Sequence, residues 1–194
     1  MVPVKQNYKI YQGSTFRDVI RWESEVKGYV QVMAATQSAP LVLTTAPHTI
    51  PPGWRCKISN VAGMKELNNS TTYYVPTATT PTSLTFQAVN SVGYSSYTTG
   101  GIVEYNVPQD LTGYVARMQL REKLTSQAVL HELTTENGGI VLDNINKTIA
   151  LYISSEDTTE FDFKSAVYSL ELASPSNTVQ LVTGTITLVT EVTR

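Results

Sequence analysis

The sequence predicts an all-β protein in which an antiparallel sandwich is interrupted by a second, smaller β-domain. Apolar and polar residues alternate with period two in several short segments, which is typical of strands with one face in water. Turn-forming residues separate these segments, as they do in β-sandwiches. Between residues 28 and 105 the composition changes, because this stretch holds most of the prolines and few charges. We therefore expect a discontinuous sandwich, residues 1–27 and 106–194, and an inserted domain, residues 28–105.

The discontinuous sandwich begins with residues 12–22, which we expect to form a strand beside residues 114–120. In the second of these segments Tyr114, Ala116 and Met118 alternate with mostly polar residues. One face of that strand is therefore apolar and the other faces water. The other strands expected in this domain are residues 148–153, 166–172 and 185–192.

Turn and helix signals connect these strands. Residues 142–147 are rich in Asp and Asn, which favour a tight turn. Residues 154–161 predict a short helix, because Ser154 or Ser155 can cap a first turn that carries acidic side chains. Pro175 lies in the hairpin turn that we expect before the last strand.

The inserted domain is expected to be a compact barrel of short strands. Pro51, Pro52 and Gly53 bend the chain before one of these strands, because proline fixes φ and cannot pair in a ladder. About 80 residues suffice for an independent core of this kind. The expected strands are residues 29–34, 41–44, 54–58, 72–75, 84–88 and 101–105.

The overall charge excludes two classes of partner. The 194 residues include 14 Lys and Arg against 16 Asp and Glu, a net charge of −2. Neither a nucleic acid nor an anionic membrane is expected to bind such a chain. No apolar run approaches the length of a membrane span, and residues 1–5 lack the apolar core of a signal peptide. We therefore expect a cytosolic chain that later assembles with a partner.

The discontinuous domain resembles a domain that is common in virion proteins of tailed bacteriophages. It is similar to the immunoglobulin-like N-terminal domain of baseplate upper proteins, and the resemblance covers nearly the whole domain in order. The segments that carry it are QGSTFRDVIRWE at residues 12–23, DLTGYVARMQLRE at 110–122, GGIVLDNINKTIALYISSEDT at 138–158, AVYSLEL at 166–172 and VQLVTGTITLVTEVTR at 179–194.

The inserted domain resembles a small β-barrel that recurs in phage tail proteins. This barrel is similar to the first catalytic-cysteine half-domain of ubiquitin-activating enzymes, which despite its name contributes no catalytic cysteine. The segments that carry the resemblance are APHTIPPGWRCKISNVAGMKELNNSTTYYV at residues 46–75, SLTFQAVNS at 83–91 and YTTGG at 97–101.

Together the two resemblances imply an immunoglobulin-like sandwich with an inserted β-barrel, and a structural rather than enzymatic role. The expected location is the tail, baseplate or fibre-attachment region of a virion, after synthesis in the host bacterial cytoplasm. The implied partners are other virion proteins of the tail, baseplate, fibre or portal-proximal ring, with several copies of the chain per particle. A capsid decoration protein is one alternative. A receptor- or glycan-binding module that acts through the tyrosine-rich loops of the barrel is another.

The residue types that could support catalysis or metal binding are sparse, and no cofactor or metal is expected. Cys56 alternates with apolar residues, so we expect a buried and inert thiol. His48 is expected to serve a turn and His131 to be exposed, since no spacing of zinc ligands surrounds either one. An acidic cluster is interpreted as a solvated helix start rather than a glycosidase pair or a calcium site. Its members are Glu156, Asp157, Glu160 and Asp162.

Tyrosines are the strongest candidates for contact residues, because a rigid ring with a polar tip is enriched at interfaces. Tyr73, Tyr74, Tyr94 and Tyr97 cluster in the inserted domain. Adjacent strand residues face opposite ways, so part of this set equally fits the barrel core. Residues 91–100 are our first choice for an exposed contact loop.

The C-terminal strand supplies a second candidate contact. We expect its edge, including Val192 and Arg194, to be available for pairing with a strand of a partner.

Overall fold

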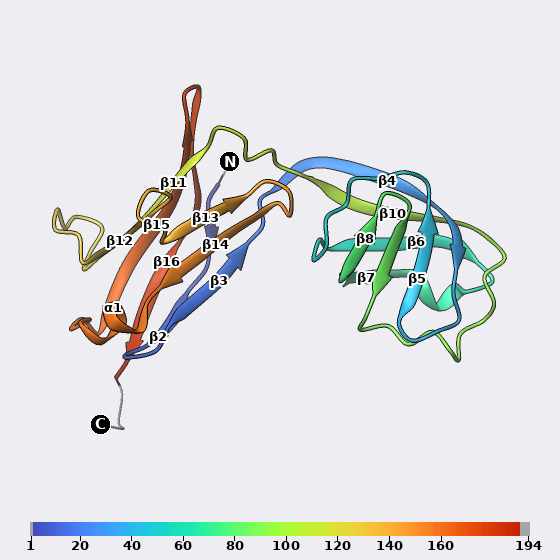
Figure 1. Ribbon diagram of the computed structural model, residues 1–194, viewed down its shortest axis with the longest axis horizontal. Coiled ribbons are helices and arrows are strands. Elements are labelled where there is room, and N and C mark those ends of the chain that lie inside the picture. The colour runs from blue at the N-terminus through green and yellow to red at the C-terminus, as the bar shows by residue number, and fades with distance from the viewer. Residues whose placement is uncertain (1, 191–194) are drawn as a thin grey trace. The chain divides into compact units, whose positions relative to one another are not determined.

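The chain folds into two compact all-β units, as Figure 1 shows, which confirms the predicted fold class. The computed structural model describes residues 2–190, with only the backbone of residues 69 and 70. The split unit comprises Met1–Trp22 and Asp110–Arg194, and the inserted unit comprises Glu23–Gln109. Each unit has a hydrophobic core of its own.

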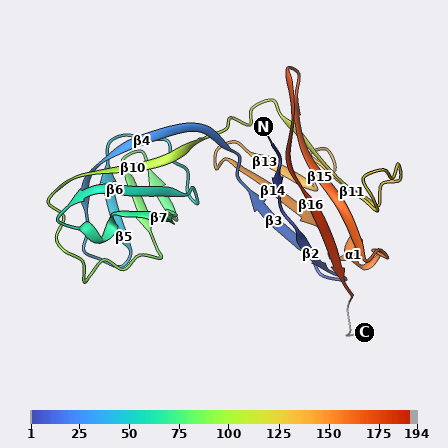
Figure 2. The same ribbon diagram turned by 180° about the vertical axis from the view of Figure 1, so that it is seen from behind.

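The split unit is built from strands and one short helix. They are β1 (Val4–Lys5), β2 (Tyr8–Tyr11), β3 (Phe16–Ile20), β11 (Val115–Arg121), β12 (His131–Thr134), β13 (Ile140–Asp143), β14 (Thr148–Ile153), α1 (Ser155–Thr159), β15 (Ser165–Ser174) and β16 (Asn177–Val189). One sheet has the order β1-β16-β15-β11-β12, and β2 also pairs with β16. The other sheet has the order β13-β14-β3. Figures 1 and 2 show these sheets as two layers.

Strand β3 does not lie beside β11, so this part of the predicted pairing is wrong. It pairs with β14 in the other sheet, from Phe16 opposite Ile153 to Ile20 opposite Ile149. The neighbours of β11 are β12 and β15. The reason is that the preceding strand β2 already lies on the edge of the larger sheet, and the turn at residues 12–15 then carries the chain across to the other layer.

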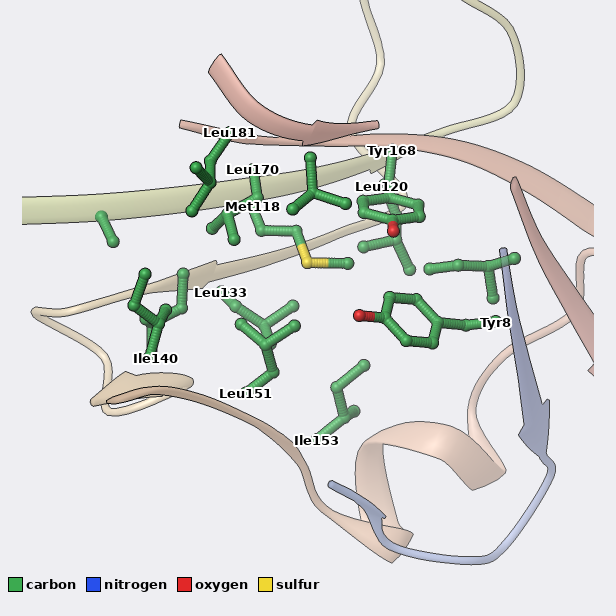
Figure 3. Close-up of a cluster of buried hydrophobic side chains, with 14 of the residues drawn as sticks. Tyr8, Met118, Leu120, Leu133, Ile140, Leu151, Ile153, Tyr168, Leu170 and Leu181 are labelled. Carbon is green, nitrogen blue, oxygen red and sulfur yellow. The ribbon is translucent and has the colours of Figure 1, made fainter. Parts of the chain in front are cut away.

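A polar link joins the two layers inside their shared core. Figure 3 shows Tyr8 and Tyr168 among the aliphatic side chains of that core. Their ring centroids lie 5.4 Å apart. The Tyr8 hydroxyl donates to Asp18 Oδ2 at 2.5 Å, from β2 in one sheet to β3 in the other. Burial raises the pKa of the Tyr8 hydroxyl, so it remains a donor at all physiological pH values.

The N-terminal edge of the larger sheet is interrupted between β1 and β2, which pair with β16 in parallel one after the other. At the interruption Asn7 Oδ1 accepts the N–H of Thr185 at 3.0 Å, in place of a backbone carbonyl. The Gln6 carbonyl accepts the Tyr168 hydroxyl at 2.8 Å. A Cβ atom at Gly184 would overlap the Gln6 carbonyl oxygen. Glycine is therefore needed at position 184 of β16, opposite the interruption between β1 and β2.

The helix and turns of the split unit follow the sequence prediction. Ser154 caps α1 by accepting the N–H of Asp157 at 3.0 Å. The buried Thr158 hydroxyl donates to the Ser14 carbonyl at 2.9 Å, so α1 holds the turn between β2 and β3. Asp143 accepts two backbone N–H groups in the turn before β14. Strands β15 and β16 form the predicted hairpin.

The inserted unit is a seven-stranded sheet wrapped around one core. Its elements are β4 (Glu23–Ala35), β5 (Leu41–Thr45), β6 (Cys56–Ala62), η1 (Lys65–Leu67), β7 (Asn69–Tyr74), β8 (Ala78–Thr80), β9 (Ser83–Phe86) and β10 (Thr99–Pro108). The strand order is β7-β6-β10-β4-β5-β9-β8. Within the described residues no ladder joins β7 to β8, so the expected barrel is open at this seam.

The boundaries between the units differ from those expected at residues 27/28 and 105/106. Strands β4 and β10 continue to pair beyond these positions, as far as Glu23 opposite Pro108. The units therefore divide after Trp22 and after Gln109. Gly28 is a packing position inside β4, because the ring of Tyr105 on the neighbouring strand lies where its Cβ would be.

Neither helical segment in residues 2–190 has the length and hydropathy of a membrane span.

Replacement of Gly184 by alanine is expected to destabilise the split unit. The new Cβ would overlap the Gln6 carbonyl oxygen, and relief of that overlap must separate the interrupted edge from β16. The expected loss in the free energy of unfolding is about 1–3 kcal/mol, as for other overpacked sites. Urea denaturation followed by tryptophan fluorescence measures it. Gly93→Ala is the control, because no atom lies within 4 Å of that added Cβ. Equal stability of the two variants would contradict the account of the interrupted edge.

Candidate contact surface

Tyr73 lies on the outer surface of the inserted unit and is 44% exposed. Its ring stands under two cations. The Arg55 guanidinium lies 4.7 Å and the Lys57 ammonium 5.2 Å from the ring centroid. Cation–π contacts at exposed sites are each worth about 0.5–1 kcal/mol. Of the predicted contact residues that the structure describes, Tyr73 is thus the one that lies on a charged surface.

Arg55 is fixed from its other side by a carboxylate. Its Nε and Nη2 donate to the two oxygens of Glu23 at 2.6 and 2.7 Å. The hydrogen bond to Glu23 raises the pKa of Arg55 further. Asn106 Nδ2 also donates to Glu23, at 3.1 Å. A bidentate pair of this geometry is more specific than an ordinary surface ion pair.

The same surface continues across β10 to β4. The strand register places Glu104 between Lys57 on β6 and Tyr29 on β4. Glu104 also pairs with Lys27 at 3.1 Å. Tyr29 is 64% exposed. We call this surface the contact face, and its members are Glu23, Lys27, Tyr29, Arg55, Lys57, Tyr73, Glu104 and Asn106.

The other three predicted tyrosines are partly buried and pack against the core. The Tyr74 hydroxyl donates to the Leu67 carbonyl at 3.1 Å, and its ring meets that of Phe86 edge-on. Burial raises the pKa of Tyr74. Tyr94 and Tyr97 are half-buried and pack against the same core. The surroundings of these three tyrosines therefore fit the second interpretation, in which part of the set fills the barrel core.

Tyr97 lies at the point where the pairing of β4 with β10 ends. Its hydroxyl lies 3.1 Å from the Val32 carbonyl and 2.9 Å from the Gly100 carbonyl. Beyond Val32, β4 pairs with β5 instead of β10. The hydroxyl therefore spans two strands that no longer share a ladder.

The loop at residues 91–100 is pinned at several points and is not a free surface loop. Ser91 is fully buried, and its hydroxyl lies within hydrogen-bond distance of the Thr36 and Ser38 carbonyls. Gln37 Nε2 donates to the Tyr94 carbonyl at 2.6 Å. Glu66 accepts the N–H of Ser95 at 2.8 Å. The expected exposure is correct at positions such as Val92 but wrong at Ser91.

The predicted C-terminal contact, Val192 and Arg194, lies outside the described residues. Strand β16 ends at Val189. Its edge is occupied by β1 and β2 from Val182 to Val189.

Cys56 and the histidines have the surroundings of structural residues. Cys56 is fully buried, and burial raises the pKa of its thiol to about 12. His48 Nδ1 accepts the N–H of Ile50 at 3.1 Å, which is a turn contact as expected. His131 is half-buried against the ring of Phe161, so the expectation that it is exposed is wrong. Burial lowers the pKa of both histidines.

The acidic cluster lies at and after α1, as expected for a capped helix start. Glu156 and Asp157 occupy its first turn, and Asp157 also accepts the Ser154 hydroxyl at 2.6 Å. Glu160 and Asp162 are exposed beyond the helix. Within residues 2–190 no three His, Cys, Asp or Glu side chains gather closely enough to hold a metal ion.

Sequence reasoning missed Tyr29 as a surface residue. The signal is the alternation in β4, where Val30 and Val32 are buried while Tyr29, Gln31 and Met33 are exposed. That pattern identifies the outward face of the strand, but it does not reveal that Glu104 and Lys57 lie next to Tyr29.

Comparisons of the chain with models of protein families and with curated proteins found no match. The contact face is therefore assessed on its own chemistry.

Tyr97→Phe is expected to destabilise the inserted unit by about 1 kcal/mol, the usual net value of one hydrogen bond. The ring still fills its place, whereas the Val32 and Gly100 carbonyls lose the bridging hydroxyl. Urea denaturation of the full chain measures the change. Tyr29→Phe is the matched control, because the exposed Tyr29 hydroxyl has no hydrogen-bond partner within the described residues. An unchanged stability of Tyr97→Phe would show that the hydroxyl does not hold β4 and β10 together.

The Cys56 thiol is expected to resist a disulfide reagent in the folded protein at pH 8. With a pKa of about 12, hardly any of it is the reactive thiolate, and no solvent reaches it. The same thiol should react readily in urea. Absorbance of the released thiolate follows the reaction, and rapid labelling without denaturant would contradict the burial of this residue.

Proposed function

We propose that this chain is a structural component of a tailed-bacteriophage virion, at the tail, baseplate or fibre-attachment region, and that it acts through protein–protein contacts. The resemblance of both domains to phage virion proteins supports the proposal. The observation that carries it is the contact face, where Arg55 is held between Glu23 and the ring of Tyr73. In this proposal the chain is a binding scaffold and not an enzyme.

The composition of the contact face suits a protein partner. Arginine and tyrosine are the residues most enriched among those that dominate binding energy. Here they are already ordered by an ion pair and by cation–π contacts before any partner arrives. Preordered side chains lose less conformational entropy on binding, so more of the contact energy appears as affinity.

Repetition explains why a face of moderate size is enough. A virion ring presents the same contact several times, and the neighbouring contacts raise the effective concentration of each one. Several copies of the chain per particle are therefore part of the proposal. The partners are the other proteins of the ring or fibre on which the copies assemble.

Virions of the phage that encodes the chain are expected to contain it, and Tyr73→Ala is expected to reduce its incorporation. Loss of a contact tyrosine costs about 1–2 kcal/mol per site, which is roughly tenfold in affinity. Mass spectrometry of purified particles measures the amount of the chain. Tyr152→Ala is the control, because Tyr152 is an exposed tyrosine of the split unit that also lies under an arginine. Absence of the wild-type chain from purified particles would refute the proposal.

A capsid decoration protein would pass the same test, so the position in the particle must also be determined. Electron microscopy of virions that carry a labelled chain separates the two locations. Density at the tail or baseplate supports the proposed role, and density on the capsid surface would replace it with the decoration role.

A further inference from the structure

The outer surface of the inserted unit has a shallow hollow of about 460 Å³ that shares Tyr29 with the contact face. We call it the glycine hollow. Its lining residues are Tyr29, Val30, Gln31, Asn60, Gly100, Gly101 and Ile102. No charged side chain lines it, in contrast to the ion pairs at the Tyr73 end of the surface.

Two neighbouring glycines of β10 line the hollow. Gly100 and Gly101 have φ angles of +73° and +107°. The pairings on either side place Gly101 opposite Asn60, which also has a positive φ of 58°. A Cβ at Gly101 would lie 2.9 Å from a Val61 methyl and 3.0 Å from Val32 Cβ. Both valines are buried, so a side chain at Gly101 would enter the core, and the positive φ angles also favour glycine at both positions.

The walls of the hollow combine an exposed ring with free amides. Tyr29 stands at one side with most of its surface in solvent. Gln31 follows it on the same outward face of β4, and Asn60 lies across β10 on β6. Neither side-chain amide has a hydrogen-bond partner within the described part of the chain. Each amide offers both a donor and an acceptor.

We propose that the glycine hollow is a binding subsite for a neutral saccharide. A sugar ring has an apolar C–H face that can stack on Tyr29 and a rim of hydroxyls that both donate and accept, which matches the Gln31 and Asn60 amides. A charged ligand would find no countercharge here. A purely apolar ligand would cover the two amides and leave them unpaired, which disfavours its binding.

The shallow shape indicates weak binding to each copy. A single sugar that contacts one ring and two amides is expected to bind with a dissociation constant of about 1 mM, or roughly −4 kcal/mol. Several copies on one particle would raise the avidity by orders of magnitude. The subsite does not depend on the proposed place in the virion, because it is formed entirely by residues of the inserted unit.

Saturation-transfer NMR of the purified full chain tests the proposal. The probes are glucose, galactose, rhamnose and N-acetylglucosamine, each at about 10 mM, tenfold above the expected dissociation constant. Wild-type protein is expected to transfer saturation to at least one sugar. Tyr29→Ala should weaken that binding at least tenfold, and Gln31→Ala should weaken it severalfold. Tyr73→Ala is the matched control, because it removes an exposed tyrosine from the same unit but outside the hollow.

Two results would overturn the saccharide subsite. One is the absence of transfer to all four sugars from a folded wild-type chain. The other is binding that Tyr29→Ala leaves unchanged, which would place the sugar elsewhere. Circular dichroism of each variant shows that the fold is retained. Incorporation into virions is measured separately, so failure of the sugar test leaves the structural role standing and the reverse also holds.

Discussion

Completion of the sandwich depends on the pairing of the N-terminal segment with strands that come after the insertion. This segment gives β1 and β2 to the edge of one sheet and β3 to the edge of the other. Tyr8 and Asp18, which both belong to it, are hydrogen-bonded between the sheets. The turn between β2 and β3 is held by Thr158 of α1 and by Gln12, whose amide donates to the Phe161 carbonyl at 2.9 Å. The core of the split unit is thus enclosed by both parts of the chain.

One outer face of the inserted unit has a charged end and a neutral end. At the end near Tyr73, charges of both signs are paired, and two cations lie over the tyrosine ring. At the other end, Gly100 and Gly101 of β10 line the glycine hollow together with Tyr29 and two neutral amides. The two ends meet at Tyr29 and Glu104, whose pairing across β4 and β10 keeps them on one rigid sheet.

Period-two patterning was sufficient to predict most strands, because burial in a sheet alternates along the chain. Segments such as β11 and β14 therefore emerged directly from their residues. The partner of each strand cannot be predicted in this way, because alternation shows which face is buried but not which strand lies alongside. The predicted pairing of β3 with β11 is wrong for that reason. The orientation of each tyrosine was also undetermined: Tyr73 and Tyr74 differ by one position, and only the register with β6 decides which one faces the core.

The pairing of Glu23 with Pro108 means that the polypeptide enters and leaves the inserted unit at adjacent points. Because the two ends of the insertion are adjacent, an ordinary surface loop between β3 and β11 of the split unit is enough to accommodate it. A gene that encodes such a protein can therefore acquire, lose or exchange this module by recombination without disturbing the host fold. Such an exchange would leave the separate core of the split unit intact.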